Sequence, residues 1–146
     1  MNDLKTKLGT IVIACLLMTT VQAQSLQGKW TVEKVTIEKN TDGKVQTTVY
    51  DSAAEVQSYI PCMKELVVNA QNITLRYPSG WEETAKYTLD GNQLKIMAAT
   101  AMQSYQYSLN GASLILTVTY NYVNNLPTGQ TKQIEEKWII NLVKNL

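Results

Sequence analysis

The sequence predicts an all-β fold: an antiparallel up-and-down meander closed into a barrel of about eight to nine strands, with one short helix near residues 52–60. Apolar and polar residues alternate from Trp30 to Leu142, and turn residues recur roughly every ten positions. A hairpin pattern also occurs twice, at 87–96 and 107–116. Closure is expected because a long meander with few charges at its edges otherwise leaves backbone groups unpaired.

The chain divides into a secretory signal peptide at residues 1–23 and one domain at residues 24–146. Lys5 and Lys7 precede an apolar run over 8–18, which is shorter than the roughly 20 residues of a membrane-spanning helix. We therefore expect a secreted or periplasmic protein with no transmembrane segment. A lipoprotein signal ending at Cys15 is the alternative, but the apolar run continues after Cys15, which argues against a lipid anchor.

Turn residues set the limits of the predicted elements. Asp90-Gly91 and Asn110-Gly111 are dipeptides that accept the positive φ angles of tight hairpin turns, and Pro or Gly marks the turns at 78–80 and 126–129. Residues 52–59 form the one stretch with a helical pattern. The predicted strands are 29–38, 44–50, 64–69, 72–77, 81–89, 93–98, 103–109, 113–122 and 130–143.

Side chains alternate across a strand, so the hairpin turns determine which residues share a face. One face collects mainly apolar residues and the other collects Ser, Thr, Lys and Gln, which predicts an inner and an outer side. Nine alternating strands would leave the first and last parallel, so one segment could be split, merged or outside the barrel. The predicted inner residues are Leu66, Val68, Ile73, Leu75, Tyr77, Ala85, Tyr87, Leu89, Leu94, Ile96, Tyr105, Tyr107, Leu109, Leu114, Leu116, Val118, Tyr120, Tyr122, Trp138, Ile140 and Leu142.

Gly28-Lys29-Trp30, followed by a barrel-like meander, resembles the Gly-x-Trp opening of lipocalins, and the whole domain resembles short lipocalin-like domains of exported bacterial proteins. The resemblance implies a barrel that encloses a small, mostly apolar ligand and has no catalytic residues. It also implies that a late basic residue, Lys144 or Lys137, packs across Trp30. In lipocalins this Trp marks the closed end, whereas strand alternation predicts Trp30 at the end of the barrel where aromatic residues gather near the turn at 78–80.

The composition excludes several chemistries. The chain has no histidine, which rules out Ser-His-Asp and Cys-His catalysis and His-based metal sites. Without residues 1–23 the basic and acidic side chains are equal in number, so no attraction to nucleic acid is expected. Cys62 is then the single cysteine, which excludes an internal disulfide and indicates a small buried apolar residue. We predict no catalytic residues, no metal and no cofactor.

A ligand site is predicted where aromatic residues fall toward one set of strand ends, near the turn at 78–80 and the connections at 51–62, 98–102 and 123–129. Such rings offer apolar faces with polar handles. Glu83 and Glu136 fall on the inner side, where they either stay hydrated or orient a ligand's polar group; an enzyme would rest on these two carboxylates alone. The predicted ligand-binding residues are Tyr77, Trp81, Glu83, Gln103, Tyr105, Tyr107, Tyr120 and Tyr122.

Two functions follow from this pattern. The first is a non-enzymatic exported protein that encloses a small hydrophobic or amphipathic ligand. The second is a periplasmic protein-interaction module, such as a proteinase inhibitor or a subunit of an envelope complex, because an eight-stranded barrel is narrow enough for its own side chains to fill. The interior volume separates them: a void of a few hundred Å³ supports a carrier, and a solid core supports an interaction domain.

Overall fold

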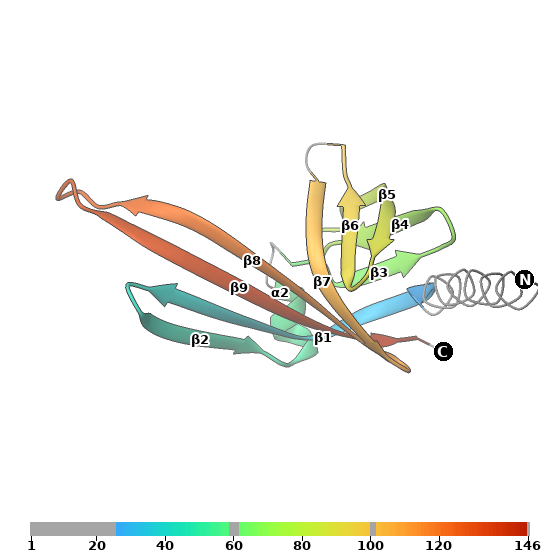
Figure 1. The fold of residues 1–146 in the computed structure, drawn as a ribbon. Helices are drawn as coiled ribbons and strands as arrows, with labels where there is room; N and C mark the ends of the chain where they lie inside the picture. Colours follow the sequence, from blue (N-terminus) through green and yellow to red (C-terminus); the bar gives the residue numbers. More distant parts are fainter. Residues whose placement is uncertain (1–25, 59–61, 100–101, 146) are drawn as a thin grey trace, which may run out of the picture.

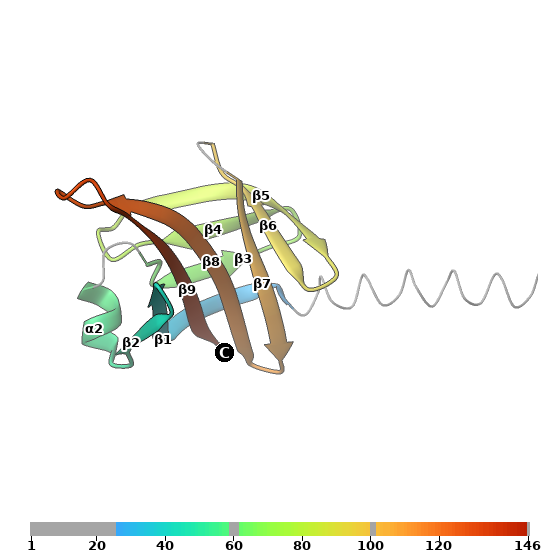
Figure 2. The ribbon, with the colours of Figure 1, turned by 60° about the vertical axis from the view of Figure 1, so that its left-hand side comes forward.

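The fold is an antiparallel β-barrel, described by a computed structural model over residues 26–58, 62–99 and 102–145 (Figures 1 and 2). The predicted strands and helix are confirmed in order, with ends displaced by a few residues at most. The signal peptide at residues 1–23 and Cys15 lie outside the described residues. The elements are β1 (Gly28–Thr41), β2 (Lys44–Tyr50), α2 (Ala53–Ser58), β3 (Glu65–Val68), β4 (Asn72–Arg76), β5 (Glu82–Asp90), β6 (Gln93–Met97), β7 (Met102–Asn110), β8 (Ser113–Asn125) and β9 (Thr131–Lys144).

Eight of these strands close the barrel and β2 lies outside it. The sheet order is β2-β1-β3-β4-β5-β6-β7-β8-β9, and β1 also pairs with β9, which joins the two ends. The first residues of β1, Gly28–Thr31, pair with β3, while Val35–Thr41 pair with β2. The parallel contact that nine barrel strands would have required is therefore avoided, because β1 and β9 meet antiparallel.

The segment between β2 and β3 corrects the predicted position of Trp30. This segment is not a hairpin: α2 carries the chain back, so β2 and β3 both run antiparallel to β1. Trp30 therefore lies near the turn at 69–72 and the C-terminal end of β9, opposite the turn at 78–80. Trp30 marks the closed end of the barrel, and the prediction from simple alternation was wrong at this point.

Local interactions account for α2. Ser52 and Glu55 form a capping box, in which the Glu55 N–H donates to Ser52 Oγ and the Ser52 N–H donates to Glu55 Oε2, both at 3.2 Å. Val56 is buried in the hydrophobic core and anchors the helix. In the part of the chain that the structure describes, helical segments are too short or too polar to span a bilayer.

The predicted inner face forms the core. Trp30 and the inner Leu and Ile residues of β3, β4, β6, β8 and β9 are almost fully buried, and each such aliphatic side chain contributes about 1.5–3 kcal/mol on burial. Tyr120 and Tyr122 depart from this pattern, with 44% and 40% of their surface exposed. Both side chains lie on the predicted inner face of β8, but at a point where β8 has extended past the barrel.

Glycines at the first position of two-residue loops make the hairpins. Asp90 pairs with Gln93 and Asn110 with Ser113, so the loops are Gly91-Asn92 and Gly111-Ala112. The φ angles of Gly91 and Gly111 are +58° and +59°, as a type II′ turn requires at its first central residue. The predicted central dipeptides, Asp90-Gly91 and Asn110-Gly111, therefore each lie one residue before the observed loops.

Four strands continue beyond the barrel as a sheet whose inner face buries Val35 and Ile37 and whose outer face has no buried side chain (Figure 1). β7 pairs with β8 only as far as Thr117, whereas β8 and β9 stay paired to Asn125 and Thr131. We call this part the extension; its strand order is β2-β1-β9-β8 and its residues are 35–41, 44–50, 118–125 and 131–138. Its two edge strands are exposed on both faces, over 44–49 of β2 and 119–125 of β8.

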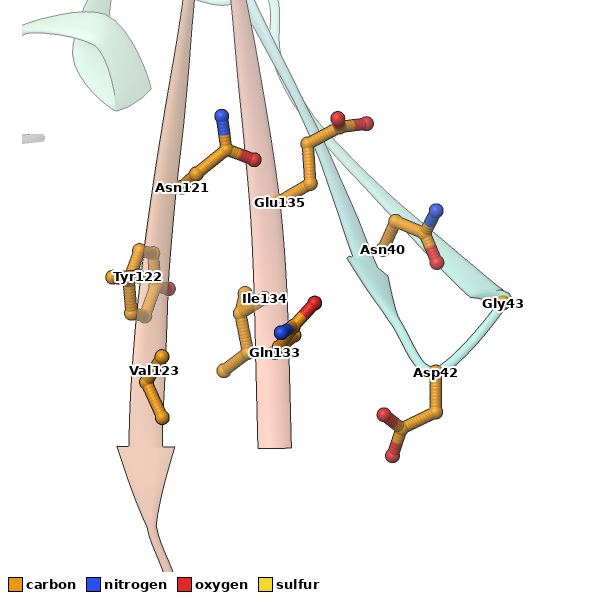
Figure 3. Close-up of a pocket in the computed structure, with 9 residues that line it drawn as sticks. All are labelled: Asn40, Asp42, Gly43, Asn121, Tyr122, Val123, Gln133, Ile134 and Glu135. Carbon is orange, nitrogen blue, oxygen red and sulfur yellow. The ribbon is translucent and has the colours of Figure 1, made fainter. Parts of the chain in front are cut away.

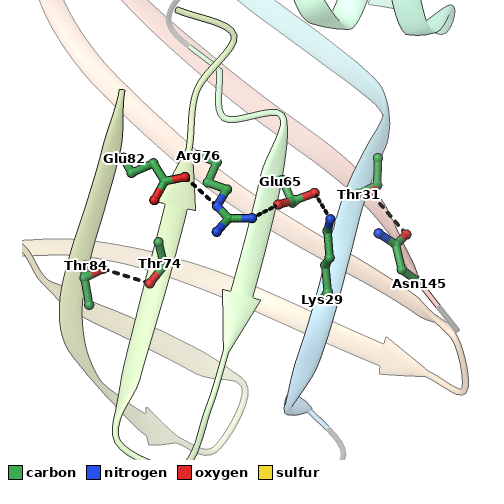
Figure 4. Close-up of polar contacts among 8 residues, drawn as sticks. All are labelled: Lys29, Thr31, Glu65, Thr74, Arg76, Glu82, Thr84 and Asn145. Atoms are coloured by element: carbon green, nitrogen blue, oxygen red, sulfur yellow. Dashed lines mark hydrogen bonds and ion pairs between the residues drawn. The ribbon is translucent and has the colours of Figure 1, made fainter. Parts of the chain in front are cut away.

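A ladder of charged side chains crosses the outside of the barrel wall (Figure 4). Arg76 lies opposite Glu65 on one side and Glu82 on the other, and it pairs with them at 2.7 and 2.8 Å. Lys29 reaches the other oxygen of Glu65 at 2.7 Å. Burial works against ionisation of Glu65, but hydrogen bonds from Lys29 and Arg76 outweigh it and hold the Glu65 pKa below its usual value.

The closed end is sealed around Trp30. Its Nε1–H donates to the Leu26 carbonyl at 2.8 Å, and Lys144 Nζ lies 5.4 Å from the centre of the indole ring. Lys137 instead pairs with Glu38 on the extension at 3.6 Å, so Lys144 is the late basic residue that packs across Trp30. Gly28 permits this packing, because a Cβ there would lie 2.7 Å from Lys144 Cε.

We predict that Gly28→Ala destabilises the fold by about 1–3 kcal/mol, because the φ of +133° is unfavourable for Ala and the new methyl group displaces Lys144. Gly80→Ala is the matched control: Gly80 also has a positive φ, but its Cβ would enter open space. Urea denaturation should show a larger loss at Gly28. Lys144→Ala should cost less in the Gly28→Ala background than alone, and strictly additive costs would show that the two residues do not interact.

Candidate functional site

The open end of the barrel, which we call the mouth, lies at the turns after β4 and β6. Four predicted ligand-binding residues meet there around one cavity: Tyr77, Gln103, Tyr105 and Tyr120. The cavity has a volume of about 50 Å³, room for one or two waters at about 30 Å³ each. The rest of its lining is Cys62, Met63, Leu75, Val118, Trp138 and Ile140.

Tyr105 forms the floor of the mouth. Its side chain is buried and its hydroxyl donates to Gln103 Oε1 at 2.7 Å. Burial raises the Tyr105 pKa well above its usual value, and burial likewise raises the pKa of Tyr77 and of Tyr120. These hydroxyls therefore stay protonated at neutral pH and provide neutral hydrogen-bonding groups rather than a base.

Aromatic pairs form the rim. Trp81 is 56% exposed and its ring centre lies 4.9 Å from that of Tyr77, with the planes tilted by 32°. Across the mouth, Tyr120 meets Trp138 edge to face at 6.1 Å. The rim thus presents flat apolar surface to solvent above a closed floor.

The other predicted site residues lie elsewhere or only at the margin. The Tyr107 hydroxyl donates to the Gly91 carbonyl at 3.2 Å, which places it toward the closed end. Tyr122 lies further out on the extension and donates to Glu136 Oε2 at 2.9 Å; Trp138 Nε1–H donates to Glu136 Oε1 at 2.6 Å. Glu83 lies opposite Leu75, and its charge contributes to the raised pKa of Tyr77. Glu136 is thus engaged by neighbouring side chains on the predicted inner face.

Sequence reasoning missed two parts of the mouth. Trp138 was predicted to point inward but was not assigned to the site, although parity and its position opposite Val118 place it there. Cys62 and Met63 belong to the connection before β3, where no periodic pattern indicates a facing direction. Cys62 is buried, as predicted, and burial raises its pKa from 9.0 to about 12.

The outer face of the extension carries a second feature, an open hollow of about 570 Å³ (Figure 3). Register places Val45, Asn40, Glu135 and Asn121 in one row across its four strands. The amide oxygen of Asn40 is buried without a hydrogen-bond partner. The lining is mainly amides and carboxylates, at Asn40, Asp42, Gly43, Asn121, Tyr122, Val123, Gln133, Ile134 and Glu135.

Comparison of the chain with family models, curated proteins and solved structures found no significant match in any of the three. Among the described residues, no three His, Cys, Asp or Glu side chains are grouped so that they could hold a metal ion.

The Cys62 thiol predicts how stability changes at alkaline pH. The unfolded thiol loses its proton near pH 9 and the folded thiol near pH 12, so the unfolded state binds fewer protons between these values. The free energy of unfolding should therefore fall as pH rises through this window, by at most about 1.4 kcal/mol per pH unit for this group. Urea denaturation at stepped pH measures the slope. Cys62→Ala should give a shallower slope than wild type, and an unchanged slope would contradict the assignment.

Proposed function

We propose that this chain is a non-enzymatic binding module that docks a protein partner on the extension. The observation that carries the proposal is the outer face of the extension, where the sheet continues past the barrel and the side chains are exposed or half-buried; the buried side chains of the extension, such as Val35 and Ile37, lie on its inner face. Sheets normally bury at least one face against another element. An outer face that no described element covers, flanked by edge strands exposed on both faces, is therefore a surface suited to a partner.

The barrel interior supports the same choice. A ligand-enclosing site typically has about 300–1,000 Å³, and the cavity at the mouth has about 50 Å³. Its aromatic rings fill space that a carrier would leave to a ligand. Of the two functions that the sequence predicts, the interaction module fits this packed interior better than the carrier does.

The outer face of the extension has the mixed chemistry of a transient protein interface. Val45 and Val123 are 63% and 58% exposed and lie on the same face as Asn40, Asn121 and Glu135. Val49, on that face of β2, is also exposed. Isolated valines among amides and carboxylates suit a partner that offers small apolar side chains together with backbone hydrogen-bonding groups.

We predict that Val45→Asp and Val49→Asp abolish or strongly weaken binding of a stoichiometric partner captured by wild-type protein from extract of the source cells. A buried carboxylate without a counter-charge opposes docking. Ile115→Asp is the matched control, since Ile115 is an exposed β-branched residue on the barrel wall. Retention of the partner by both extension variants, measured by quantitative mass spectrometry, would contradict the proposal.

A second candidate function, binding of a small hydrophobic or amphipathic molecule, is favoured by the Tyr77–Trp81 pair alone, in which exposed Trp81 stacks on half-buried Tyr77. Such a molecule would lie across the rim rather than inside the barrel. Titration with 1-anilinonaphthalene-8-sulfonate tests it by the gain in dye fluorescence. Binding should weaken about tenfold in Tyr77→Ala and stay unchanged in Tyr107→Phe at the closed end; equal binding by both would remove this candidate.

The lipocalin resemblance and export remain part of the proposal. Lys144 packs across Trp30 at the closed end, and this contact supports the likeness suggested by Gly28-Lys29-Trp30. The charge and hydropathy pattern of residues 1–23 supports a secreted or periplasmic location. A docking module of this kind acts without a cofactor.

A further inference from the structure

The edge of β8 in the extension lacks a neighbouring strand. Within the described residues, β8 pairs with β7 only as far as Thr117, and Val118–Asn125 pair with β9 alone. Both views of the ribbon show β7 diverging from β8 beyond this point (Figures 1 and 2). An edge of this length is a template for another strand.

Half of the backbone groups of this segment point to the empty side. The Ala112 carbonyl and the Leu126 N–H, which flank β8, bond toward β9 through Lys144 and Gln130 at 2.8 Å each. The β8–β9 register has no shift between these points. By the alternation of an antiparallel ladder, the N–H and C=O groups of Thr119, Asn121, Val123 and Asn125 therefore face away from β9.

The usual protection of an edge strand is missing here. Natural edges carry charges, prolines or bulges that prevent pairing. Residues 118–125 read Val-Thr-Tyr-Asn-Tyr-Val-Asn-Asn, without charge or proline, and pair with β9 without a bulge. The other edge of the extension, β2, is shorter and begins with Lys44.

The segment is complementary to itself. A two-fold axis perpendicular to the sheet keeps each face on its own side, so Asn121 meets Asn121 of a second copy. In this register Thr119 pairs with the second copy's Val123, and Tyr120 with its Tyr122. Aromatic pairs and pairs of β-branched residues favour strand association, and no like charges oppose each other. Because the strands run antiparallel, the second barrel lies beyond the hairpin tip and does not compete for the same space.

We propose that two copies of this chain associate through the β8 edges, centred on Asn121, to form one continuous sheet from both extensions. The inference rests on the proposed function, because it uses the same extension as an interaction surface, and it specifies a second copy as the partner at the edge. The outer face that carries Val45 and Val49 stays available to another protein in this arrangement.

Sedimentation velocity of the domain at increasing concentration tests the proposal. Wild type should form a dimer, and Asn121→Glu and Asn121→Lys should each weaken self-association at least about tenfold, because like charges meet at the axis. An equimolar mixture of the two variants should restore the dimer as a mixed pair. Thr47→Glu, an exposed position on the β2 edge strand, is the control that should leave the dimer unchanged.

Cysteine cross-linking tests the register. Asn121→Cys should form an intermolecular disulfide under mild oxidation, since directly opposed Cα atoms lie about 5.5 Å apart. Val45→Cys should not, and the native Cys62 is buried. A wild-type monomer at all concentrations, or a dimer insensitive to charge at 121, would overturn the inference. A monomer that still binds a protein partner sensitive to Val45→Asp would overturn the inference and leave the proposed function standing.

Discussion

The pairing of β1 with β9 is the constraint on which the rest of the structure depends. β1 pairs with β9 along one edge, and on its other edge its first residues pair with β3 in the barrel and its later residues pair with β2 in the extension. One strand therefore belongs to two structures, a packed barrel and an open sheet. The shift in register between Val32 and Lys34 lies where β1 passes from one to the other.

Local signals were sufficient to predict the strands. Alternation and turn residues act over a few positions, so β5 to β8 have nearly the predicted limits, and the inner face of the barrel follows by parity. The end of the barrel at which Trp30 lies could not be predicted from these local signals. It depends on whether β2 and β3 form a hairpin, and the capping box of α2, which returns the chain, contains no information on which strand β3 will pair with.

The candidate site was predicted less completely, for a different physical reason. Parity indicates that Tyr105, Tyr107 and Tyr120 share a face, but not their height along the barrel. Tyr107 lies toward the closed end, while Tyr120 lies where β8 has left β7. The length of a strand relative to its neighbours is a property of the assembled sheet. The volume left at the mouth likewise depends on how rings from five or more elements interlock.

The extension continues the residue pattern of a barrel strand beyond the barrel core. β8 keeps an alternating pattern of core type past Thr117, with Tyr120 and Tyr122 on the inner face, yet the barrel no longer supplies a core there. A sequence selected only for a solvated ribbon would place charged residues at such an edge. The uncharged edge and the half-exposed tyrosines are instead consistent with burial by a surface that the isolated chain does not contain.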